Sequence, residues 1–478
     1  MKKTNWLFIF LLLTGLILSG CSGDSESSGD GEKDGTVTLT FWNRYAELRG
    51  GLDTLIADFE KEHPGIKIEK QETPSDTAET QLRTALSEDK LPDLFTNTVQ
   101  LSELIEVDAV KNLDEVFTDE VKAQFHDGTW FENGTTASGS VYSFPLASPR
   151  SKAMIMYYNK DVFDMLGLTE DDIPATWEEF SDVGKKIIEL SDGAVSPLVW
   201  NNPGWANEQL VTMMATAISP ETPWQENYKE GVPSLATQGK IETTKYLKGL
   251  LDDGIMAPQS VEVGLAEAEA SFAIGQSAFL FSGDWVGRQL VVENEFKNWG
   301  VAPLPTKEGK PYYYQAGSEA SGIMVNNKTE HWEEVKIFLE YCLENLHREV
   351  YVDTGAGIPA KKDVGGEPPF EQYTAIGELE EQLSIPVPKP GELNPATIQF
   401  DRDYKSKLEV GGIGDAIVGY MTGNIDDIEG ELKKLDQAMN DAFLETLEEN
   451  PDVSQEDYIY PNWEPFVPYT LDKYAELK

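Results

Sequence analysis

Cysteine and histidine are scarce in this sequence, which contains two cysteines and four histidines among 478 residues. Cys342 lies in WEEVKIFLEYCLENL, where apolar residues recur at helical spacing, so the pattern predicts a buried and unreactive thiol. Because Cys21 is expected to be modified, Cys342 has no partner for an internal disulfide. The histidines are scattered along the chain and lack the spacing of a metal site. We therefore expect no disulfide, no metal and no cofactor.

Common catalytic motifs are also absent from the sequence. It contains no His-Glu-x-x-His, no Gly-x-Ser-x-Gly and no Walker loop, which argues against zinc peptidases, α/β-hydrolases and P-loop NTPases. A glycosidase needs only two carboxylates at a set separation, and the 84 acidic residues leave that alternative open. A (β/α)₈ barrel would show about eight strand–helix cycles, and the helix-rich C-terminal half does not fit that pattern.

Positive charge is in short supply, because 38 Lys and Arg face 84 Asp and Glu. A surface this acidic repels nucleic-acid phosphates and anionic lipid head groups, so neither is expected as a partner. Salt relieves the self-repulsion of such a surface. We therefore hypothesise that the protein works in salty or alkaline surroundings.

Long hydrophobic runs are limited to Leu7–Leu18, which is too short to span a bilayer comfortably. Following Lys2 and Lys3, this run is typical of a signal peptide covering residues 1–20. The sequence Leu-Ser-Gly-Cys that ends at Cys21 resembles a bacterial lipobox, in which the cysteine is acylated and becomes the mature N-terminus. The alternative is an ordinary signal peptide with a chance cysteine. Residues 21–35 are rich in Ser, Gly and Asp and predict a flexible linker.

The folded part is expected to begin at residue 36 with an α/β arrangement. The stretch TVTLTFW alternates as a strand does, the apolar residues from Leu48 to Phe59 recur at helical spacing, and IKIEK alternates again. Strand, helix and strand in so short a span predict a parallel βαβ unit. A further short strand is expected near 94–97. Ligands of such sheets bind beyond the carboxyl ends of the strands.

Several stretches in register resemble one large protein family. They are LTFWNRYAE…ADFEKEHPGIKIE, LPDLF, MYYNKDVFDMLGL…IPATWEEF, FAIGQSAFLFSGDW, GIPAKKDV and MTGNIDDIEGELKKLDQAMNDAF. Each motif is weak alone, but their order over residues 36–443 resembles the extracellular solute-binding proteins of ABC importers, in the family that captures sugars and oligosaccharides. Two features depart from it: Gln276 stands where lysine is common, and an aromatic-rich tail covers residues 450–478.

The resemblance implies a two-lobe periplasmic-binding-protein-like (Venus flytrap) α/β fold, with discontinuous lobes joined by a hinge. It implies a first lobe of residues 36–147 plus 271–316 and a second lobe of residues 148–270 plus 317–449. The chain would cross between them near 145–150, 264–272 and 317–323. The density of tyrosine and tryptophan in the tail predicts that it packs on the protein.

A sugar has a hydroxyl rim that needs paired donors and acceptors, and C–H faces that stack on aromatic rings. Clusters of both residue types therefore define the candidate ligand site. The candidates are Trp42, Arg44, Glu47, Asn97, Arg150, Trp200, Trp205, Asp284, Trp285, Gly317, Ser318 and Glu319. The resemblance points most directly to Trp285, because the matching tryptophan of the family commonly stacks on ligand. For each tryptophan the alternative is a core position.

Together these patterns predict a monomeric, lipid-anchored receptor on the outer face of the cell membrane. It would bind a sugar or oligosaccharide, change no bonds, and deliver the ligand to the membrane permease of an ABC importer. Its only membrane contact would be the lipid at Cys21. The alternatives are a secreted polysaccharide-active enzyme and a binding protein for a non-sugar solute.

Overall fold

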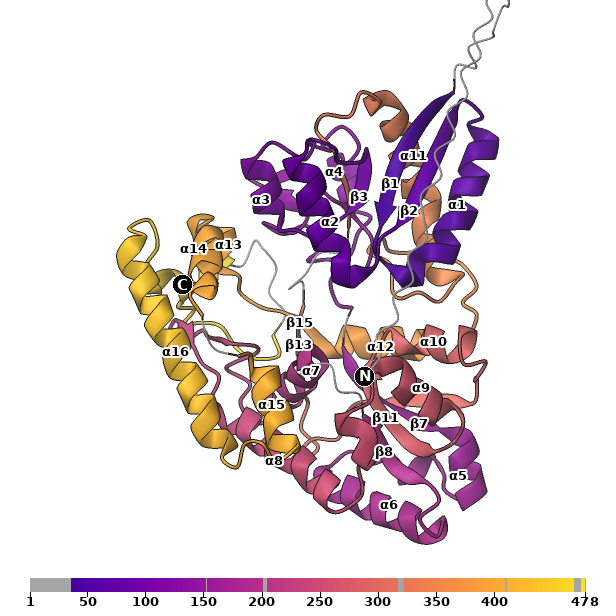
Figure 1. Cartoon of the computed structure of the whole chain (residues 1–478), viewed down its shortest axis with the longest axis vertical. Helices are drawn as coiled ribbons and strands as arrows, with labels where there is room; N and C mark the ends of the chain where they lie inside the picture. The colour runs from indigo at the N-terminus through magenta and orange to yellow at the C-terminus, as the bar shows by residue number, and fades with distance from the viewer. Residues whose placement is uncertain are drawn as a thin grey trace, which may run out of the picture. The chain divides into compact units, whose positions relative to one another are not determined.

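A computed structural model describes residues 36–151, 153–200, 204–316, 322–408, 411–467 and 474–477. From Val37 onward the chain forms one compact unit that contains two mixed β-sheets with helices packed against them (Figure 1). Within the described ranges, no helix combines the length and the apolar character that a bilayer-spanning segment needs.

The first sheet has the strand order β2-β1-β3-β14-β6. Its strands are β1 (Val37–Asn43), β2 (Ile66–Glu72), β3 (Leu94–Thr96), β6 (Phe144–Pro145) and β14 (Gly322–Val325). β1 pairs in parallel with both β2 and β3, whereas β14 runs antiparallel to β3 and β6. Between β1 and β2 lies α1 (Arg49–Glu62), which buries Leu52, Leu55 and Phe59. The predicted parallel βαβ unit is confirmed.

The second sheet has the order β12-β7-β11-β8. Its strands are β7 (Met154–Asn159), β8 (Ser196–Trp200), β11 (Ser277–Gly283) and β12 (Trp299–Ala302). Every residue of β7 and β11 is buried, which is the pattern of central strands covered on both faces. α6 (Trp177–Leu190) begins with a capping box, in which Thr176 and Glu179 bond each other's backbone N–H groups.

The remaining helices cover these sheets and form a helical C-terminal region. The long helix α16 runs beside α14 and α15 (Figure 1). The other elements that matter below are α2 (Ser75–Ser87), α3 (Leu101–Glu106), α7 (Gly204–Ala215), β9 (Glu226–Asn227), α9 (Leu265–Ala273), α10 (Val286–Val292), β13 (Tyr314–Ala316), α11 (Trp332–Leu346), α12 (Tyr373–Leu383), α13 (Pro390–Leu393), α14 (Ala396–Ser406), α15 (Ile413–Met421), α16 (Ile428–Glu449) and the 3-10 turns η1 (Ala46–Leu48) and η5 (Gln455–Tyr458).

The sheet pairing differs from the expected lobe boundaries. β11 and β12 pair with β7, so residues 277–302 belong with the second sheet and not with residues 36–147. In turn β14 joins the first sheet, and α11 packs on the core of that sheet with Cys342 fully buried. The reason is that β11 is apolar along most of its length and is covered only in the middle of a sheet, between β7 and β8.

This pairing determines which segments connect the hydrophobic core of the first sheet with that of the second. The first lies between β6 and β7, which contains the expected crossing at 145–150. The expected crossing at 264–272 instead coincides largely with α9, which leads into β11 of the same sheet as β8. A passage that we did not expect lies between Ala360, in the core of the first sheet, and Phe370, in the core of the second. The return from β13 to β14 spans residues 317–321, which lie outside the described residues.

The described part of the tail packs against the protein. Tyr460 and Trp463 form an aromatic cluster with Tyr228 and Tyr313. The Trp463 and Tyr228 ring centroids are 4.9 Å apart in an edge-to-face arrangement, which is favourable for aromatic pairs. This cluster attaches the tail to the region between α7 and β13, next to the cavity described below.

Candidate ligand-binding cavity

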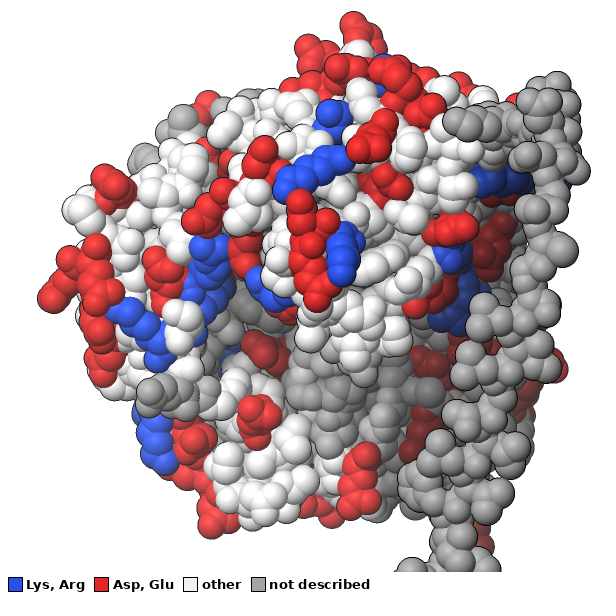
Figure 2. All heavy atoms as spheres, turned by 45° about the horizontal axis from the view of Figure 1, so that its top comes forward, with Lys and Arg blue, Asp and Glu red and all other residues white. Residues whose placement is uncertain are grey.

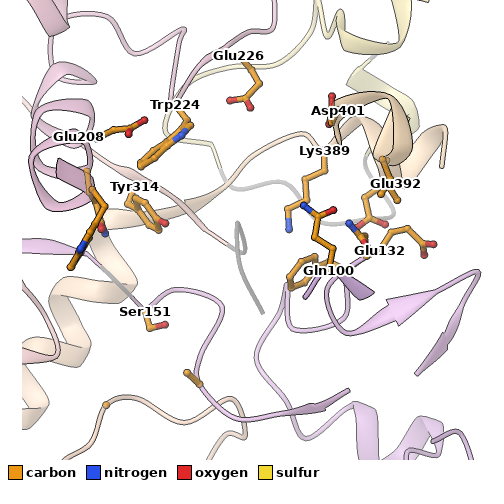
Figure 3. Close-up of a pocket in the computed structure, with 18 of the residues that line it drawn as sticks. Gln100, Glu132, Ser151, Glu208, Trp224, Glu226, Tyr314, Lys389, Glu392 and Asp401 are labelled. Carbon is orange, nitrogen blue, oxygen red and sulfur yellow. The ribbon is translucent and has the colours of Figure 1, made fainter. Parts of the chain in front are cut away.

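A cavity of about 950 Å³ is lined by loops and helices, some connected to the strands of the first sheet and some to those of the second. Its walls combine aromatic rings with charged and amide side chains. The lining includes Arg44, Tyr45, Glu47, Gln100, Phe131, Glu132, Asn133, Ser151, Trp205, Glu208, Gln209, Trp224, Glu226, Tyr228, Asp284, Trp285, Tyr314, Tyr351, Lys389, Glu392, Asp401, Arg402 and Lys405. Figure 3 places Glu208, Trp224 and Tyr314 on one side and Gln100, Lys389 and Glu392 on the other.

Two pairs of aromatic rings line one side of the cavity. The rings of Trp205, at the start of α7, and Trp285, at the N-cap of α10, have centroids 5.9 Å apart and are inclined at 43°. Trp205 is 52% exposed, which is unusual for a large apolar ring and leaves its face available to a ligand. The second pair, Trp224 and Tyr314, meets edge to face at 6.0 Å.

The place of Trp285 depends on the glycine that ends β11. A Cβ atom at Gly283 would come within 2.1 Å of the Trp285 ring, so only glycine leaves room for the indole there. The loop is fixed further by Tyr157 on β7, whose hydroxyl donates to the carbonyl oxygens of Gly283 at 2.8 Å and Asp284 at 3.2 Å. The backbone N–H of Asp284 donates to the carbonyl of Ala153 at 3.0 Å. Asp284 and Trp285 are thereby presented together at the cavity.

Carboxyl groups lie beside the aromatic rings. Glu208 on α7 accepts a hydrogen bond from the Gln225 amide at 3.2 Å, and burial raises the pKa of its carboxyl group. Glu226 on β9 lines the same region. Carboxylate oxygens next to aromatic faces are suited to the hydroxyl groups and C–H faces of a sugar.

The carboxyl ends of β1 and β3 contribute a hydrogen-bonded group, as expected for a parallel pair. Arg44 donates through Nε to the carbonyl of Asn97 at 2.6 Å and through Nη2 to the Tyr45 hydroxyl at 2.9 Å. The Tyr45 hydroxyl donates to the Asn97 side chain at 2.9 Å, and the backbone N–H of Gly322 does the same at 2.9 Å. Arg44, Tyr45 and Glu47 line the cavity, and Asn97 holds two of them in place.

The far side of the cavity is built by α13, α14 and the residues before them. The Lys389 ammonium lies 3.6 Å from the centre of the Phe131 ring, a cation–π contact. Burial lowers the pKa of Lys389 to about 8, although Glu392 opposes that shift. Glu392 accepts a hydrogen bond from the backbone N–H of Glu132 at 2.8 Å. These contacts connect α13 to the loop that follows α4 (Asp119–Lys122) in the first half of the chain.

Other candidates from the sequence occupy different places. Trp42 is half-buried and packs against a cluster that includes Leu82 and Phe95, so it braces α2 and β3. Trp200 is 2% exposed and lies in the core of the second sheet. Arg150 pairs with Glu381 on α12 at 2.6 Å and lines a separate cavity of about 490 Å³. Gly317, Ser318, Glu319 and Cys21 lie outside the described residues.

Several lining residues were not among the sequence candidates. Trp224 could have been predicted as a site residue from the sequence, since it stands in the polar, proline-containing loop PETPWQENY. Lys389 and Glu392, at the start of and within the short helix α13, could not be predicted, because the loop that they contact, at Phe131 and Glu132, is distant in sequence. Among the described residues, no group of three or more His, Cys, Asp or Glu side chains is arranged to hold a metal ion.

The protein has two mixed β-sheets covered by helices, and residues from both parts line an aromatic and acidic cavity. This arrangement defines a ligand-binding protein of the periplasmic-binding-protein fold. Residues 45–345 match the family of bacterial extracellular solute-binding proteins, and the chain belongs to that family. This membership places it among binding proteins and not among enzymes.

Relatives of known name support the same assignment. The chain is 24% identical to the multiple sugar-binding protein of Streptococcus mutans, over 74% of this chain and 81% of the relative. It is 23% identical to the melibiose/raffinose/stachyose-binding protein MelE of Bacillus subtilis, over 86% and 97%.

Solved structures share the fold. A chitin oligosaccharide binding protein superposes with a TM-score of 0.64 at 20% identity, covering 86% of this chain and 99% of that one. RafE in complex with raffinose superposes with a TM-score of 0.62 at 21% identity, covering 85% and 100%.

Proposed function

We propose that this protein is the lipid-anchored receptor of an ABC importer and captures a sugar or oligosaccharide in the 950 Å³ cavity. The observation that carries the proposal is the Trp205–Trp285 ring pair with Asp284 and Glu208 at the same cavity. Aromatic faces bind the C–H surface of a sugar ring, and the adjacent carboxylates accept its hydroxyl protons.

The size of the cavity favours an oligosaccharide over a single sugar ring. Small-molecule sites range over about 300–1,000 Å³, and this cavity lies near the upper end of that range. The names of MelE and of the structural relatives, which refer to melibiose, raffinose, stachyose and chitin oligosaccharides, point in the same direction.

The sequence around Cys21 supports the lipid anchor. Acyl chains on its sulfur and on the new N-terminus would together hold the protein at the outer face of the membrane, since two chains anchor stably where one does not. Replacing Cys21 by Ala should release the protein into the medium. Retention of this variant in the membrane fraction would argue against acylation.

Isothermal titration calorimetry tests the binding function directly. The chain from Ser22 onward is titrated with raffinose, stachyose, arabinooligosaccharides and chitin oligosaccharides, and the mixtures are then analysed by chromatography for shorter products. We expect one-to-one binding of one class without products. Heat with product release would favour a polysaccharide-active enzyme, and silence across the panel would favour a non-sugar solute.

A further inference from the structure

Lys240 is a buried lysine next to Trp224, which lines the ligand cavity. It lies in the first turn of α8 (Gln238–Asp252) and is 1% exposed. Burying an ammonium group is costly, and a cation in the first turn of a helix also faces the positive end of the helix dipole. An apolar side chain such as methionine would fill much of the same space without either cost. What the lysine adds is therefore its hydrogen bonds and its charge.

The ammonium group of Lys240 closes the base of a hairpin formed by residues 224–234. It donates one hydrogen bond to the carbonyl oxygen of Trp224 and another, at 3.4 Å, to the carbonyl oxygen of Ser234. Between these two residues, β9 and β10 (Val232–Pro233) pair as antiparallel strands. One lysine side chain thus ties together the two ends of the hairpin.

The hairpin carries residues that line the cavity. Trp224 and Glu226 are among the lining residues, whereas Lys240 is not. Gln225, between the two, donates from its side-chain amide to Glu208 at 3.2 Å and from its backbone N–H to Glu226 at 3.1 Å. Figure 3 shows Glu208, Trp224 and Glu226 on the same side of the cavity. A shift of this end of the hairpin would therefore move an aromatic ring and a carboxylate of the site together.

Other contacts fix the tip and the second strand of the hairpin. At the tip, Lys229 donates to two backbone carbonyls of the C-terminal tail, at 2.7 Å and 2.9 Å. After the second strand, the backbone N–H of Leu235 donates to Asp436 on α16 at 2.6 Å. Lys240 connects the Trp224 end to these anchored parts. Its loss should therefore displace Trp224 without detaching the hairpin.

The charge of Lys240 is set among carboxyl groups from three surrounding elements. Burial lowers the pKa of Lys240 to about 8, against the attraction of Glu226 on β9, Glu208 on α7 and Asp436 on α16. The pKa of Glu208 is itself raised by burial and by Asp415 on α15, and is lowered by Lys240 and by Lys405 on α14. The positive charge of Lys240 thus offsets two of the carboxylates at the cavity.

We propose that Lys240 is a positioning residue of the ligand site, which ties the two ends of the hairpin together and thereby sets the place of Trp224 and Glu226 at the cavity. It touches no ligand and acts through these two residues. A neutral amine is a weaker donor than an ammonium group, so ligand binding should weaken when Lys240 loses its proton. The effect on binding rests on the proposed sugar-binding function, whereas the position of Trp224 does not.

The position of Trp224 is tested without any ligand, by fluorine NMR of the full chain in detergent, labelled with fluorotryptophan. The Trp224 resonance is identified as the one that is missing from Trp224→Phe. We expect this resonance to shift in Lys240→Met. It should keep its place in Lys248→Met, a control on the same helix that breaks an ion pair with Asp252. An unchanged Trp224 resonance in Lys240→Met would overturn the proposal.

The pH dependence of the same resonance decides the matter even where Lys240→Met fails to fold. In the wild type, the Trp224 resonance should titrate with a midpoint near pH 8. The pKa of Lys389 is also lowered to about 8, but Lys389 lies on the opposite side of the cavity (Figure 3), so the titration should persist in Lys389→Met. A resonance that stays constant between about pH 6.5 and pH 9.5, or a titration that is lost in Lys389→Met, would contradict the role of Lys240.

Titration calorimetry with raffinose, and then with the other sugars of the panel, tests the effect on binding. At about pH 6.5, Lys240→Met should bind about tenfold more weakly than the wild type, and Lys248→Met should stay within about twofold of it. As the pH rises to about 9.5, this difference should shrink, because only the wild type loses the proton of Lys240. Lys389 titrates in both proteins, so its contribution cancels in the comparison.

Equal affinities of the wild type and Lys240→Met, or a difference that does not change with pH, would overturn the role of Lys240 in ligand binding. If the wild type binds neither raffinose nor the other sugars, the proposed function fails. The NMR results still decide in that case whether Lys240 sets the position of Trp224.

Discussion

The hydroxyl group of Tyr458, in η5 of the C-terminal tail, donates a hydrogen bond of 2.6 Å to Oδ1 of Asp401 on α14. Asp401 lines the ligand cavity. The aromatic tail, which the sequence predicts to pack on the protein, therefore contacts a residue that lines the cavity. Burial raises the pKa of Asp401 to about 6, while Lys405 and Tyr458 act in the opposite direction.

Replacing Tyr458 by Phe should destabilise the protein in a pH-dependent way. The hydroxyl stabilises the charged form of Asp401, so its loss leaves a buried carboxylate without that donor and should cost about 1–3 kcal/mol at pH 8. Below a pKa of about 6 Asp401 is increasingly neutral, and the cost should shrink. Denaturant unfolding at pH 5 and pH 8 measures the difference.

The control for this prediction is Tyr420→Phe. Tyr420 packs against the same core, but its hydroxyl makes no hydrogen bond with a described residue. Its replacement should change stability little, and equally at both pH values. A loss in Tyr458→Phe that is the same at both pH values would mean that Asp401 does not change its charge between pH 5 and pH 8.

Replacing Trp285 by Ala should weaken sugar binding by about tenfold or more, equivalent to about 1.4 kcal/mol, because a stacking surface is removed from the cavity. Folding should be retained, since the ring is only partly buried. Titration calorimetry with the best ligand of the panel gives the affinity. Trp332→Ala on α11, a half-buried tryptophan in cation–π contact with Lys111, serves as the matched control. Equal affinities for wild type and Trp285→Ala would remove Trp285 from the site.

Arg402 on α14 forms ion pairs that link α14 to α3. Its guanidinium nitrogens lie 3.8 Å from Oε1 of Glu103 and 3.6 Å from Oε2 of Glu106, both on α3. We expect Arg402→Gln to speed ligand release by up to about fivefold at low salt, because partly exposed ion pairs contribute about 0–1 kcal/mol. High salt should abolish the difference by screening.

Stopped-flow displacement of bound sugar measures this rate. Lys433→Gln, which breaks an ion pair with Glu429 within α16, is the control and should leave release unchanged. An acceleration that is the same at low and high salt would show that Arg402 acts by packing and not by charge.

The acidic surface should make stability depend on salt. Figure 2 shows Asp and Glu side chains over much of one face, with Lys and Arg set among them. Several cations serve two carboxylates, as Lys407 does with Glu445 at 3.3 Å and Glu449 at 2.7 Å. Repulsion among the remaining carboxylates is screened by KCl, so the thermal midpoint should rise by several degrees between low salt and about 1 M, where the Debye length is about 3 Å.

Sucrose at equal osmolality separates charge screening from solvent exclusion, because it stabilises proteins without screening charge. We expect a smaller rise in sucrose than in KCl. Equal rises in the two solutes, or no rise in KCl, would contradict a role for charge repulsion.

Local periodicity alone predicted the elements that build the first sheet. The alternation of residues 36–42 and the spacing from Leu48 to Phe59 correspond to β1 and to the buried face of η1 and α1, because side-chain direction repeats every two residues in a strand and every 3.6 in a helix. The spacing around Cys342 likewise predicted a buried thiol. The arginine and glutamate after β1 could be predicted to lie at the cavity, because parallel strands end at one edge of a sheet.

Tertiary structure decided which of these elements pair and which tryptophans line the cavity. Trp42, Trp200 and Trp285 all lie at or near strand ends, yet the first two pack on cores and only Trp285 enters the cavity, since Gly283 leaves it room. The pairing of β11 with β7 and β8, and of β14 with β3, joins segments far apart in the chain. The composition and spacing of residues determine which way the side chains of one helix or strand point. Contacts between distant segments depend instead on which buried surfaces fit one another, and these surfaces meet only when the whole chain folds.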